Sequence, residues 1–412
     1  MSDPILTYQP SAGISVPDDI LCVTISPWEG PRRVRHHLAA EYVRRGHRVI
    51  FVEGYLTWVK LLRGREHWRQ FARLFTGLRT SPDGVLLAAV PPFLPGGEWW
   101  GRMMKFNWWM ADWWLRHVTL RSFSAHRLRL LIFAPHAEYF IGRWHERVAI
   151  YFCNDPFPEI FAHASARPNL RKMEARLARR VDIVFAVSEQ LAEARRLENP
   201  NTHLVPLAAN VPLFARAMDP ATVVPADLQS IPAPRVAYVG VVNNRIDIEL
   251  TREVARLMQS VSFVFVGPIA EATEAYKNEL ASLAKEGNVF FLGNKTDEEL
   301  PGYLKGVEAC LIPYVLNDVT RSIQANGKFF QYVASGRPVV STIGPYAFDE
   351  QIILHGTTPE TFAAALRRAL GTNTAADRAA RRRLAQQHSW DGRVDLIESL
   401  LRANTALNVS RS

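Results

Sequence analysis

The sequence has few cysteines and no long apolar run. Three cysteines occur in 412 residues, Cys22, Cys153 and Cys310, and each lies inside an apolar segment. Their spacing fits neither a disulfide framework nor a metal site, so we expect buried thiols in a reducing compartment. No apolar stretch reaches about 18 residues, and the first residues lack a charged start followed by an apolar core. We therefore expect a cytoplasmic chain with neither a membrane-spanning helix nor a secretion signal.

Several motifs of cofactor chemistry are missing as well. The loop "SPWEGPRRVRHH" follows an apolar run and precedes a helical pattern, but it is neither a GxGxxG nor a Walker fingerprint. No DxD-type pair of carboxylates stands in a supporting context. We therefore expect no metal ion and no cofactor.

The charge is unbalanced toward arginine and lysine. The chain has 49 Lys and Arg against 40 Asp and Glu, a formal net charge of +9, with 48% hydrophobic residues. This composition is typical of a soluble-type globular chain with two cores, and the charge suits phosphate-rich ligands or anionic lipid surfaces. We expect no nucleic acid as a partner, because aromatic and basic residues do not interleave in a binding module.

The chain reads as two α/β halves. Apolar runs and helical patterns alternate as in parallel sheets with covered faces: "ILCVTI", "VIFV", "GVLLAAV", "RLLIFA", "VAIYFC" and "DIVFAVS" before a Pro-rich stretch, and "RVAYVG", "SFVFVG", "VFFLG", "ACLIPY" and "RPVVST" after it. The predicted domains are residues 1–218 and 235–385, joined by a linker at 219–234. Residues 386–412 are predicted to form a C-terminal helix that returns to the first domain.

A lysine and a glutamine stand out in "NGKFFQYVASGRPVV". Lys328 and Gln331 are three residues apart on a helix predicted to start near Asn326, and burying them for structure alone would be costly. The helix N-terminus attracts anions, and Lys328 adds a full charge beside it. Gln331 would then bond a sugar hydroxyl. The alternative is a solvated lysine and a capping glutamine.

Arg245 is a second candidate for a phosphate contact. It lies in "YVGVVNNRIDIEL", after a strand and before a helix, and ligands of doubly wound sheets bind beyond the carboxyl ends of the strands. Gly240, Gly267 and Gly293 end three predicted strands. Arg245 pairing with Asp247 or Glu249 is the alternative.

The first half offers its own candidates. Gly30 could bring the backbone close to a ligand in the loop before Arg32, Arg33 and Arg35. Asp155 follows a predicted strand, where a carboxylate could accept a proton from an acceptor hydroxyl. Capping an Asp-Pro turn is its alternative role. His36, His37 and His136 lie near such loops without an identifiable partner.

Residues 96–118 hold six of the eleven tryptophans, mixed with Arg102, Lys105 and Arg116. Tryptophan with basic residues is typical of a peripheral contact with a membrane interface. A helix packed into the first domain is the alternative.

Together these segments resemble GT-B glycosyltransferases, in particular bacterial enzymes of teichuronic acid and exopolysaccharide synthesis. The resemblance rests on "HHLAAEYVRRGHRVIFVEG", "VSEQLAEARR", "LVPLAANVPLF", "RVAYVGVVNNRIDIEL", "FVFVGP", "NVFFLGNKTDEELPGYLKGVEACLIPYVLN", "GKFFQYVASGRPVVST" and "HSWDGRV". It covers nearly the whole chain and is stronger in the second half.

The resemblance implies two Rossmann-like domains that face a cleft, with a nucleotide-diphosphate sugar (UDP, GDP or dTDP) held by the second. Its diphosphate would meet Arg245, Lys328 and the helix start at Asn326. Its base would rest near Val266, Gly267, Gly293 and Asn294. Gln331 stands where related transferases usually carry a glutamate, and the amide keeps hydrogen-bonding capacity without the charge.

The implied activity is metal-independent transfer of a hexose to a lipid-linked or glycan acceptor in cell-surface polysaccharide synthesis, at the inner face of the plasma membrane. Asp155 would be the general base if the reaction inverts the anomeric centre and would position the acceptor if it retains configuration. A sugar-nucleotide epimerase of the same architecture and a catalytically silent nucleotide-sugar-binding subunit are the alternatives.

Overall fold

The structure is a computed structural model. It describes residues 18–29, 32–54, 56–61, 65–121, 127–160, 163–270, 273–317, 320, 327–344, 352–371 and 373–409. The chain divides into two compact units, Met1–Val205 and Pro206–Ser412.

The first unit contains an eight-stranded sheet in the order β3-β4-β2-β1-β5-β6-β7-β8. Its strands are β1 (Asp19–Val23), β2 (Arg48–Val52), β3 (Arg79–Thr80), β4 (Leu86–Ala88), β5 (Arg129–Ile132), β6 (Val148–Cys153), β7 (Ile183–Ala186) and β8 (Thr202–Leu204). All neighbours are parallel except β3 and β4, which pair antiparallel. The short strands β3 and β8 were not predicted, because two or three residues carry no readable alternation.

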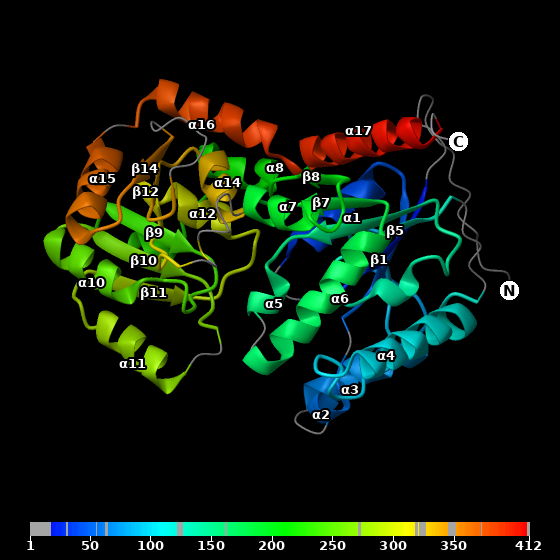
Figure 1. Ribbon diagram of the computed structural model, residues 1–412. Coiled ribbons are helices and arrows are strands. Elements are labelled where there is room, and N and C mark those ends of the chain that lie inside the picture. The colour runs from blue at the N-terminus through cyan, green and yellow to red at the C-terminus, as the bar shows by residue number, and fades with distance from the viewer. Residues whose placement is uncertain are drawn as a thin grey trace, which may run out of the picture. The chain divides into compact units, whose positions relative to one another are not determined.

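Helices connect these strands. They are α1 (Val34–Arg44), α2 (Trp58–Leu61), α3 (Arg65–Ala72), α4 (Gly101–Trp114), α5 (Phe157–Ile160), α6 (Arg167–Arg180) and α7 (Glu189–Arg196), with the 3-10 turns η1 (Arg73–Phe75), η3 (Glu138–Phe140) and η4 (Ala164–Ala166) and the π-helical turn η2 (Leu115–Thr119). Figure 1 shows α2, α3 and α4 gathered at one end of this unit. The N-terminus of α4 packs on α6, since a Cβ at Gly101 would contact Met173 and Asn169.

The second unit contains a six-stranded parallel sheet in the order β11-β10-β9-β12-β13-β14. Its strands are β9 (Arg235–Val239), β10 (Ser262–Val266), β11 (Val289–Gly293), β12 (Ala309–Ile312), β13 (Val339–Ser341) and β14 (Ile353–His355). The chain moves outward from β9 to β11 and then returns to place β12 on the other side of β9. The ends of β9 and β12 therefore form the topological switch point, where doubly wound sheets bind ligands.

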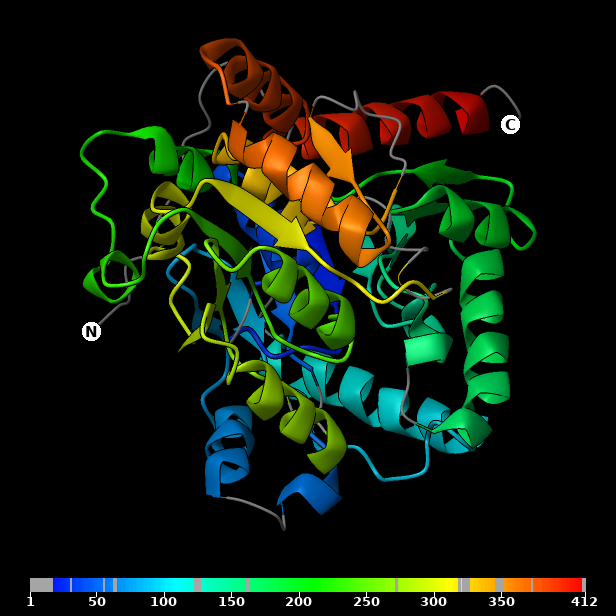
Figure 2. The ribbon, with the colours of Figure 1, turned by 90° about the vertical axis from the view of Figure 1, so that its left-hand side faces the viewer.

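Helices cover both faces of the second sheet. They are α8 (Val211–Ala215), α9 (Ala226–Gln229), α10 (Ile248–Leu257), α11 (Glu274–Leu283), α12 (Leu300–Lys305), α14 (Gly327–Ala334), α15 (Pro359–Gly371), α16 (Ala375–Gln387) and α17 (Trp390–Val409), with the 3-10 turn η5 (Arg216–Met218). α10 packs with α11 and α15, and α14 packs with α8 and α16. The two groups lie on opposite sides of the strands (Figure 2), as right-handed crossovers in opposite directions require.

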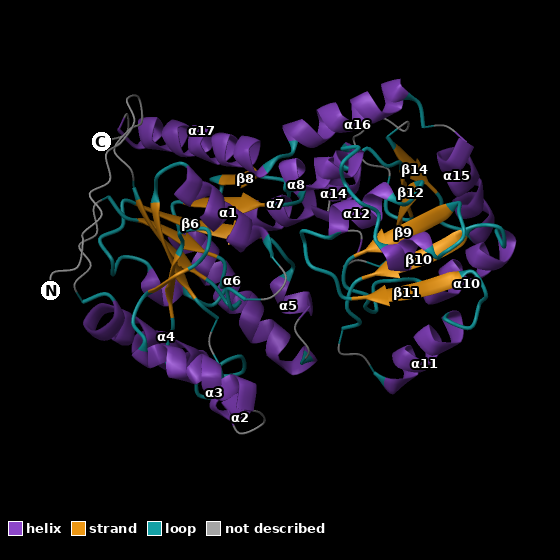
Figure 3. Ribbon diagram, turned by 180° about the vertical axis from the view of Figure 1, so that it is seen from behind, coloured by secondary structure: helices purple, strands orange, loops and turns teal. Residues whose placement is uncertain are grey.

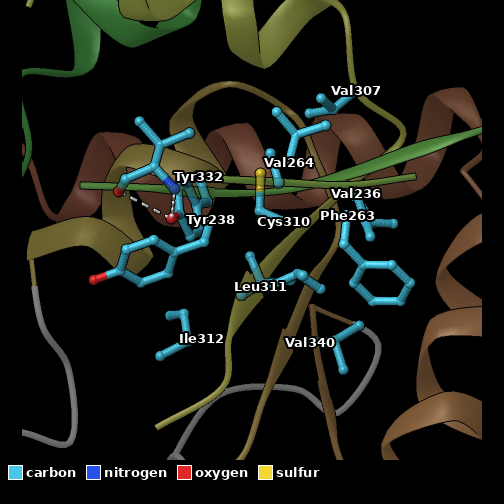
Figure 4. Close-up of a cluster of buried hydrophobic side chains, with 14 of the residues drawn as sticks. Val236, Tyr238, Phe263, Val264, Val307, Cys310, Leu311, Ile312, Tyr332 and Val340 are labelled. Carbon is cyan, nitrogen blue, oxygen red and sulfur yellow. Dashed lines mark hydrogen bonds between the residues drawn. The ribbon is translucent and has the colours of Figure 1, made fainter. Parts of the chain in front are cut away.

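The core of the second unit is assembled from its central strands. Val236, Phe263, Val264, Cys310 and Val340 are at most 1% exposed and come from four neighbouring strands (Figure 4). The continuous apolar runs in the sequence are therefore explained by burial on both faces. All three cysteines are buried and unoxidised, as predicted.

The predicted α/β class with two Rossmann-like parallel sheets is confirmed. Figure 3 shows the strands of each unit enclosed by helices. Residues 219–234, predicted as a linker, contain α9, whose Leu228 is fully buried. The predicted domain boundaries and the return of the C-terminal helix to the first domain stay predictions.

Candidate functional site

Three glycines form an open backbone edge on the second sheet. Gly240, Gly267 and Gly293 end β9, β10 and β11, with φ angles of +139°, +147° and +71°. Hydrogen bonds link them in a row, from Gly240 N to Val266 O (2.7 Å) and from Gly267 N to Gly293 O (2.8 Å). A Cβ at Gly267 would lie 2.2 Å from the Gly240 carbonyl oxygen. No side chain fits there, so backbone packs directly on backbone at Gly267, which is buried, whereas Gly240 is half-buried and Gly293 is exposed.

Lys328 reaches this edge from α14. Its ammonium nitrogen donates to the Val239 carbonyl oxygen (2.8 Å) and lies 4.3 Å from the centre of the Tyr238 ring. A Cβ at Gly240 would lie 1.8 Å from the same nitrogen. The space above Gly240 is thus occupied by a cation, and a glycine is needed there to admit it.

The charge of Lys328 is poorly solvated. Burial, together with the smaller effect of the neighbouring Arg245 charge, lowers its pKa to about 7. Among the described residues no carboxylate pairs with Lys328, and only the Val239 carbonyl and the Tyr238 ring face its ammonium. An isolated, half-buried cation of this kind gains more from an anionic ligand than a solvated lysine would.

The loop that carries Arg245 is fixed by its neighbours. Asp247 N bonds Pro313 O (2.8 Å) and Val315 N bonds Arg245 O (2.8 Å), which ties the loop after β9 to the loop after β12. The Tyr276 hydroxyl donates to Asn243 O on the other side. Arg245 therefore stands at the switch point of the sheet with a defined backbone.

The alternative pairings predicted for Arg245 are not formed. The Asp247 carboxylate accepts from Leu250 N (2.9 Å) and caps α10, and Glu249 pairs with Arg252. Within the described part of the chain the Arg245 guanidinium has no ion pair. Its charge acts with burial to lower the pKa of Lys328, and it opposes the rise in pKa that burial causes at Tyr238 and Tyr314.

The remaining predicted residues of this site differ in accessibility. Gln331 is half-buried, one turn after Lys328 on α14, and its amide bonds no other described residue. Asn294 is exposed directly after β11. The Val266 side chain is only 1% exposed and lies in the core, so this residue offers its backbone alone. Gly30 and Asn326 lie outside the described residues.

The corresponding edge of the first sheet carries Asp155. The Asn154 amide donates to the Asp155 carboxylate, and the Asp155 carbonyl accepts from Phe157 N (2.8 Å). The turn is thus closed by the Asp155 backbone. Its side chain is half-buried at the end of β6.

Arg35 is the residue of the first unit that sequence reasoning underrated. It lies in the first turn of α1, is only 4% exposed, and its Nε has no partner among the described residues. Burial lowers its pKa to about 10, and the nearby charge of Asp155 opposes that shift. The sequence could not single out Arg35, because Arg32 and Arg33 stand close to it and differ from it only in being exposed.

The histidines of this edge are structural. His36 accepts from Arg33 N (3.0 Å) and its other ring nitrogen is 2.9 Å from Pro27 O, and the Trp108 indole donates to His136 (3.1 Å). Burial lowers the pKa of His36 to about 4 and that of His136 to about 3. Both rings are neutral at physiological pH and are held by packing.

The second unit matches a known family. Residues 233–372 match the family model described as glycosyl transferases group 1. A segment of 165 residues is 26% identical to TuaH of Bacillus subtilis (strain 168), whose name assigns it to teichuronic acid biosynthesis as a glycosyltransferase, and it covers 38% of this chain and 40% of TuaH. The match thus spans less than half of the curated relative.

Solved structures resemble almost the whole chain. Sucrose-phosphate synthase of Thermosynechococcus elongatus aligns with 95% of this chain and 100% of its own, at a TM-score of 0.65 and 15% identity. Anabaena HepE in complex with UDP-glucose aligns with 94% of this chain and 100% of its own, at a TM-score of 0.62 and 14% identity. A trehalose-phosphate synthase of Burkholderia xenovorans aligns with 94% of this chain and 100% of its own, at a TM-score of 0.64 and 13% identity. These likenesses confirm the predicted GT-B fold, and the family match confirms the resemblance to glycosyltransferases.

Proposed function

We propose that this GT-B chain, whose residues 233–372 match the glycosyl transferases of group 1, transfers a hexose from a nucleotide-diphosphate sugar to a lipid-linked or glycan acceptor. The pathway is cell-surface polysaccharide synthesis, supported by the similarity to TuaH. The donor class is supported by HepE, which was solved with UDP-glucose. The reaction proceeds without a metal ion.

The observation that carries this proposal is Lys328 against the Val239 carbonyl, 2.8 Å away, beside a glycine that leaves the backbone open. When the bond between the sugar carbon and the β-phosphate oxygen breaks, the electron pair stays on the diphosphate. A cation fixed before the reaction stabilises that charge without reorganisation. Arg245 supplies a second positive group at the switch point.

The other roles follow from accessibility. The nucleobase rests against the backbone at Gly267 and Gly293, with Asn294 beside it. Gln331 donates its amide to a hydroxyl of the sugar, one turn after the lysine that holds the phosphate. Asp155 accepts the proton of the acceptor hydroxyl as the new bond to the sugar forms, and Arg35 near it favours its charged form.

The acceptor side is proposed to meet a membrane at its cytoplasmic face through residues 96–118. No described helix has the length and apolarity to pass through a bilayer. Exposed tryptophans on α4, 47% for both Trp109 and Trp113, support an interfacial contact instead.

A panel of UDP-, GDP- and dTDP-sugars tests the proposal. Thermal shift identifies the nucleotide that stabilises the folded chain, and release of nucleoside diphosphate is then followed with a membrane extract. Lys328→Gln should strongly weaken both signals, whereas Lys277→Gln removes the same charge from an exposed position of α11 and should change neither.

The panel also separates the alternatives. Transfer releases diphosphate only when the extract is present. An epimerase would interconvert the sugar nucleotide without accumulating diphosphate, and a silent subunit would bind without turnover. Equal nucleotide affinity in the wild type and in Lys328→Gln would contradict the assigned site.

A further inference from the structure

Helix α4 presents a row of exposed residues at i, i+4 spacing. Lys105, Trp109 and Trp113 follow one another along it, and His117 continues the row on η2, where the Trp113 and His117 rings stack with centroids 5.2 Å apart. Trp109 and Trp113 are 47% exposed, while Trp108 on the opposite face is 1% exposed. One tryptophan of the helix is therefore buried and two others are exposed. The buried face fits a helix packed into its own domain, and the exposed face fits a peripheral contact with a membrane.

The aromatic surface continues onto neighbouring elements. The Phe75 ring lies 6.4 Å from that of Trp114, and Phe75 itself is 73% exposed. Trp68 and Trp58 on α3 and α2 are 52% and 45% exposed. Figures 1 and 3 both show α2 and α3 beside α4. Exposed rings at this density are characteristic of an interaction surface.

A basic depression adjoins the row at Lys105. It has a volume of about 480 Å³ and is bordered by Lys105 of α4, Glu138 and Tyr139 of η3, Arg143 of the following loop and Arg180 of α6. Three cations therefore line the depression beside Glu138, and a second carboxylate, Glu146, accepts from Gly142 N and Trp144 N in the adjoining loop. Glu138 is only 5% exposed and is already matched by Arg176, at 3.2 Å, and by Lys105, at 3.7 Å.

Two of the three cations, Arg143 and Arg180, are held by groups other than carboxylates. The Arg180 guanidinium donates to the carbonyl oxygens of Glu138 (3.2 Å) and Ile141 (3.3 Å). Arg143 lies over the Tyr139 ring at 3.9 Å and, in the described part of the molecule, pairs with no acidic side chain. The depression therefore keeps excess positive charge that neighbouring side chains do not neutralise.

The depression is rigidly joined to α4. The Trp144 indole donates to the Asp112 carboxylate (2.8 Å), which also accepts from Arg116 (3.0 Å). The Arg116 guanidinium lies 4.6 Å from the centre of the Trp144 ring. These contacts connect the loop with Arg143 to the exposed row of α4, and the Arg116 guanidinium also donates to the Arg143 carbonyl oxygen.

We infer that this surface binds anionic phospholipid, with the depression between α4, η3 and α6 accepting a headgroup phosphate while Trp109 and Trp113 enter the interface. Phosphate matches an uncompensated cluster of arginine and lysine, and tryptophan prefers the level of the headgroups. The inference rests on the proposed membrane contact and adds the lipid class that it selects. This inference of lipid binding does not depend on the proposed sugar transfer.

Cosedimentation of the full chain with vesicles tests it, using phosphatidylcholine alone and phosphatidylcholine mixed with phosphatidylglycerol. The wild type should bind the mixed vesicles more than tenfold better. The double variant Lys105→Gln/Arg143→Gln should bind them about thirtyfold more weakly than the wild type, since each basic group near a charged surface contributes a severalfold factor. Trp109→Ser/Trp113→Ser should bind neither vesicle.

The matched control is Arg382→Gln/Arg383→Gln, which removes the same charge from exposed positions of α16. It should bind mixed vesicles within about threefold of the wild type. Equal losses in the two double variants would overturn the inference, because net charge alone would then explain the attraction. Arg143→Gln, on an exposed loop, repeats the measurement with a single change that leaves the core intact.

The outcomes distinguish the two proposals. Equal binding of the wild type to both vesicles would retain the membrane contact and reject the headgroup site. No binding to either vesicle would reject both, and the nucleotide panel would still judge sugar transfer by itself.

Discussion

The carboxyl edges of the two sheets are formed by different types of residue. In the second unit glycines stand at the ends of three adjacent strands, and among the described residues the Lys328 ammonium lies beside Gly240. In the first unit rings fill the corresponding region, with Trp28 5.2 Å from His36 and His136 5.7 Å from Phe157. Glycine leaves the backbone of one edge without Cβ atoms, and rings cover the other edge.

The two edges are therefore suited to two different functions, binding of an anionic ligand and proton transfer. An edge without side chains lets a large anionic ligand approach the backbone, and only a fixed charge needs to be added. An edge filled by neutral rings leaves fewer polar groups accessible, and Asp155 is a half-buried carboxylate there, with the buried Arg35 charge near it. We therefore propose donor binding at the second edge and proton transfer at the first.

The largest expected effect comes from removing the carboxylate of the first edge. Asp155→Asn should lower the rate of transfer about 10²- to 10⁴-fold, the usual contribution of a general base, and leave nucleotide affinity unchanged. The measurement is diphosphate release beside isothermal titration of the donor. Glu159→Gln, an exposed neighbour paired with Arg171, is the control.

Two results would break this division of tasks. Full turnover of Asp155→Asn would remove the base from the first edge. A parallel loss of donor affinity would show that the two edges do not act separately.

The next effect concerns Lys328, where function and stability should change in opposite directions. Lys328→Met should weaken donor binding about 100-fold, because a desolvated charged contact to phosphate is lost. The same change should raise the free energy of unfolding by about 1 to 2 kcal/mol, a discounted figure for removing a half-buried, poorly solvated charge. The Val239 carbonyl keeps the Tyr332 hydroxyl as a donor at 3.1 Å.

Urea denaturation and donor titration of the same preparation check this prediction. A destabilised variant with weak binding would mean that Lys328 serves packing. Retained binding would reject the lysine as a phosphate contact.

The strand pattern of both sheets could be read from the sequence because buried parallel strands are continuous apolar runs. Arg245 and Lys328 could be singled out as well, since each follows a strand end or starts a helix. Their joint placement could not, because Lys328 bonds a carbonyl 89 residues away in sequence. The φ of +139° at Gly240 favours glycine by itself, and the long-range contact of Lys328 adds to that preference.

Burial is the other quantity that the sequence left open. In the sequence His36, His37 and His136 were equally acceptable catalytic candidates. Only the structure shows that His36 and His136 are held by packing. Arg35 looked like its solvated neighbours. In the tryptophan segment Trp108 and Trp109 are adjacent letters, and only the helix orientation places one inside and the other outside.

Arg245→Gln should have a smaller effect than the lysine variant. Arg245 is half-buried and stands at the switch point, so we expect about a tenfold loss of donor affinity, near one charge-assisted hydrogen bond. Arg256→Gln on exposed α10 removes an arginine that pairs with Glu253 and Glu286 and should leave affinity unchanged. Equal affinities of Arg245→Gln and the wild type would confine the phosphate site to Lys328.

The smallest effect is the pH dependence of the lysine. Because the pKa of Lys328 is about 7 in the folded chain, against 10.5 for an ordinary lysine, the ammonium loses its proton just above neutrality. A bound diphosphate favours the charged form, so binding takes up a proton and donor affinity should fall about fivefold between pH 7 and pH 8.

The unfolded chain binds this proton more tightly, so the contribution of Lys328 to stability rises as pH increases from 7 toward 10.5. Isothermal titration in buffers of different ionisation enthalpy measures the proton uptake, and both slopes should vanish in Lys328→Met. If the wild type binds donor equally at the two pH values, the ammonium is already solvated and the contrast between the two edges is one of shape alone.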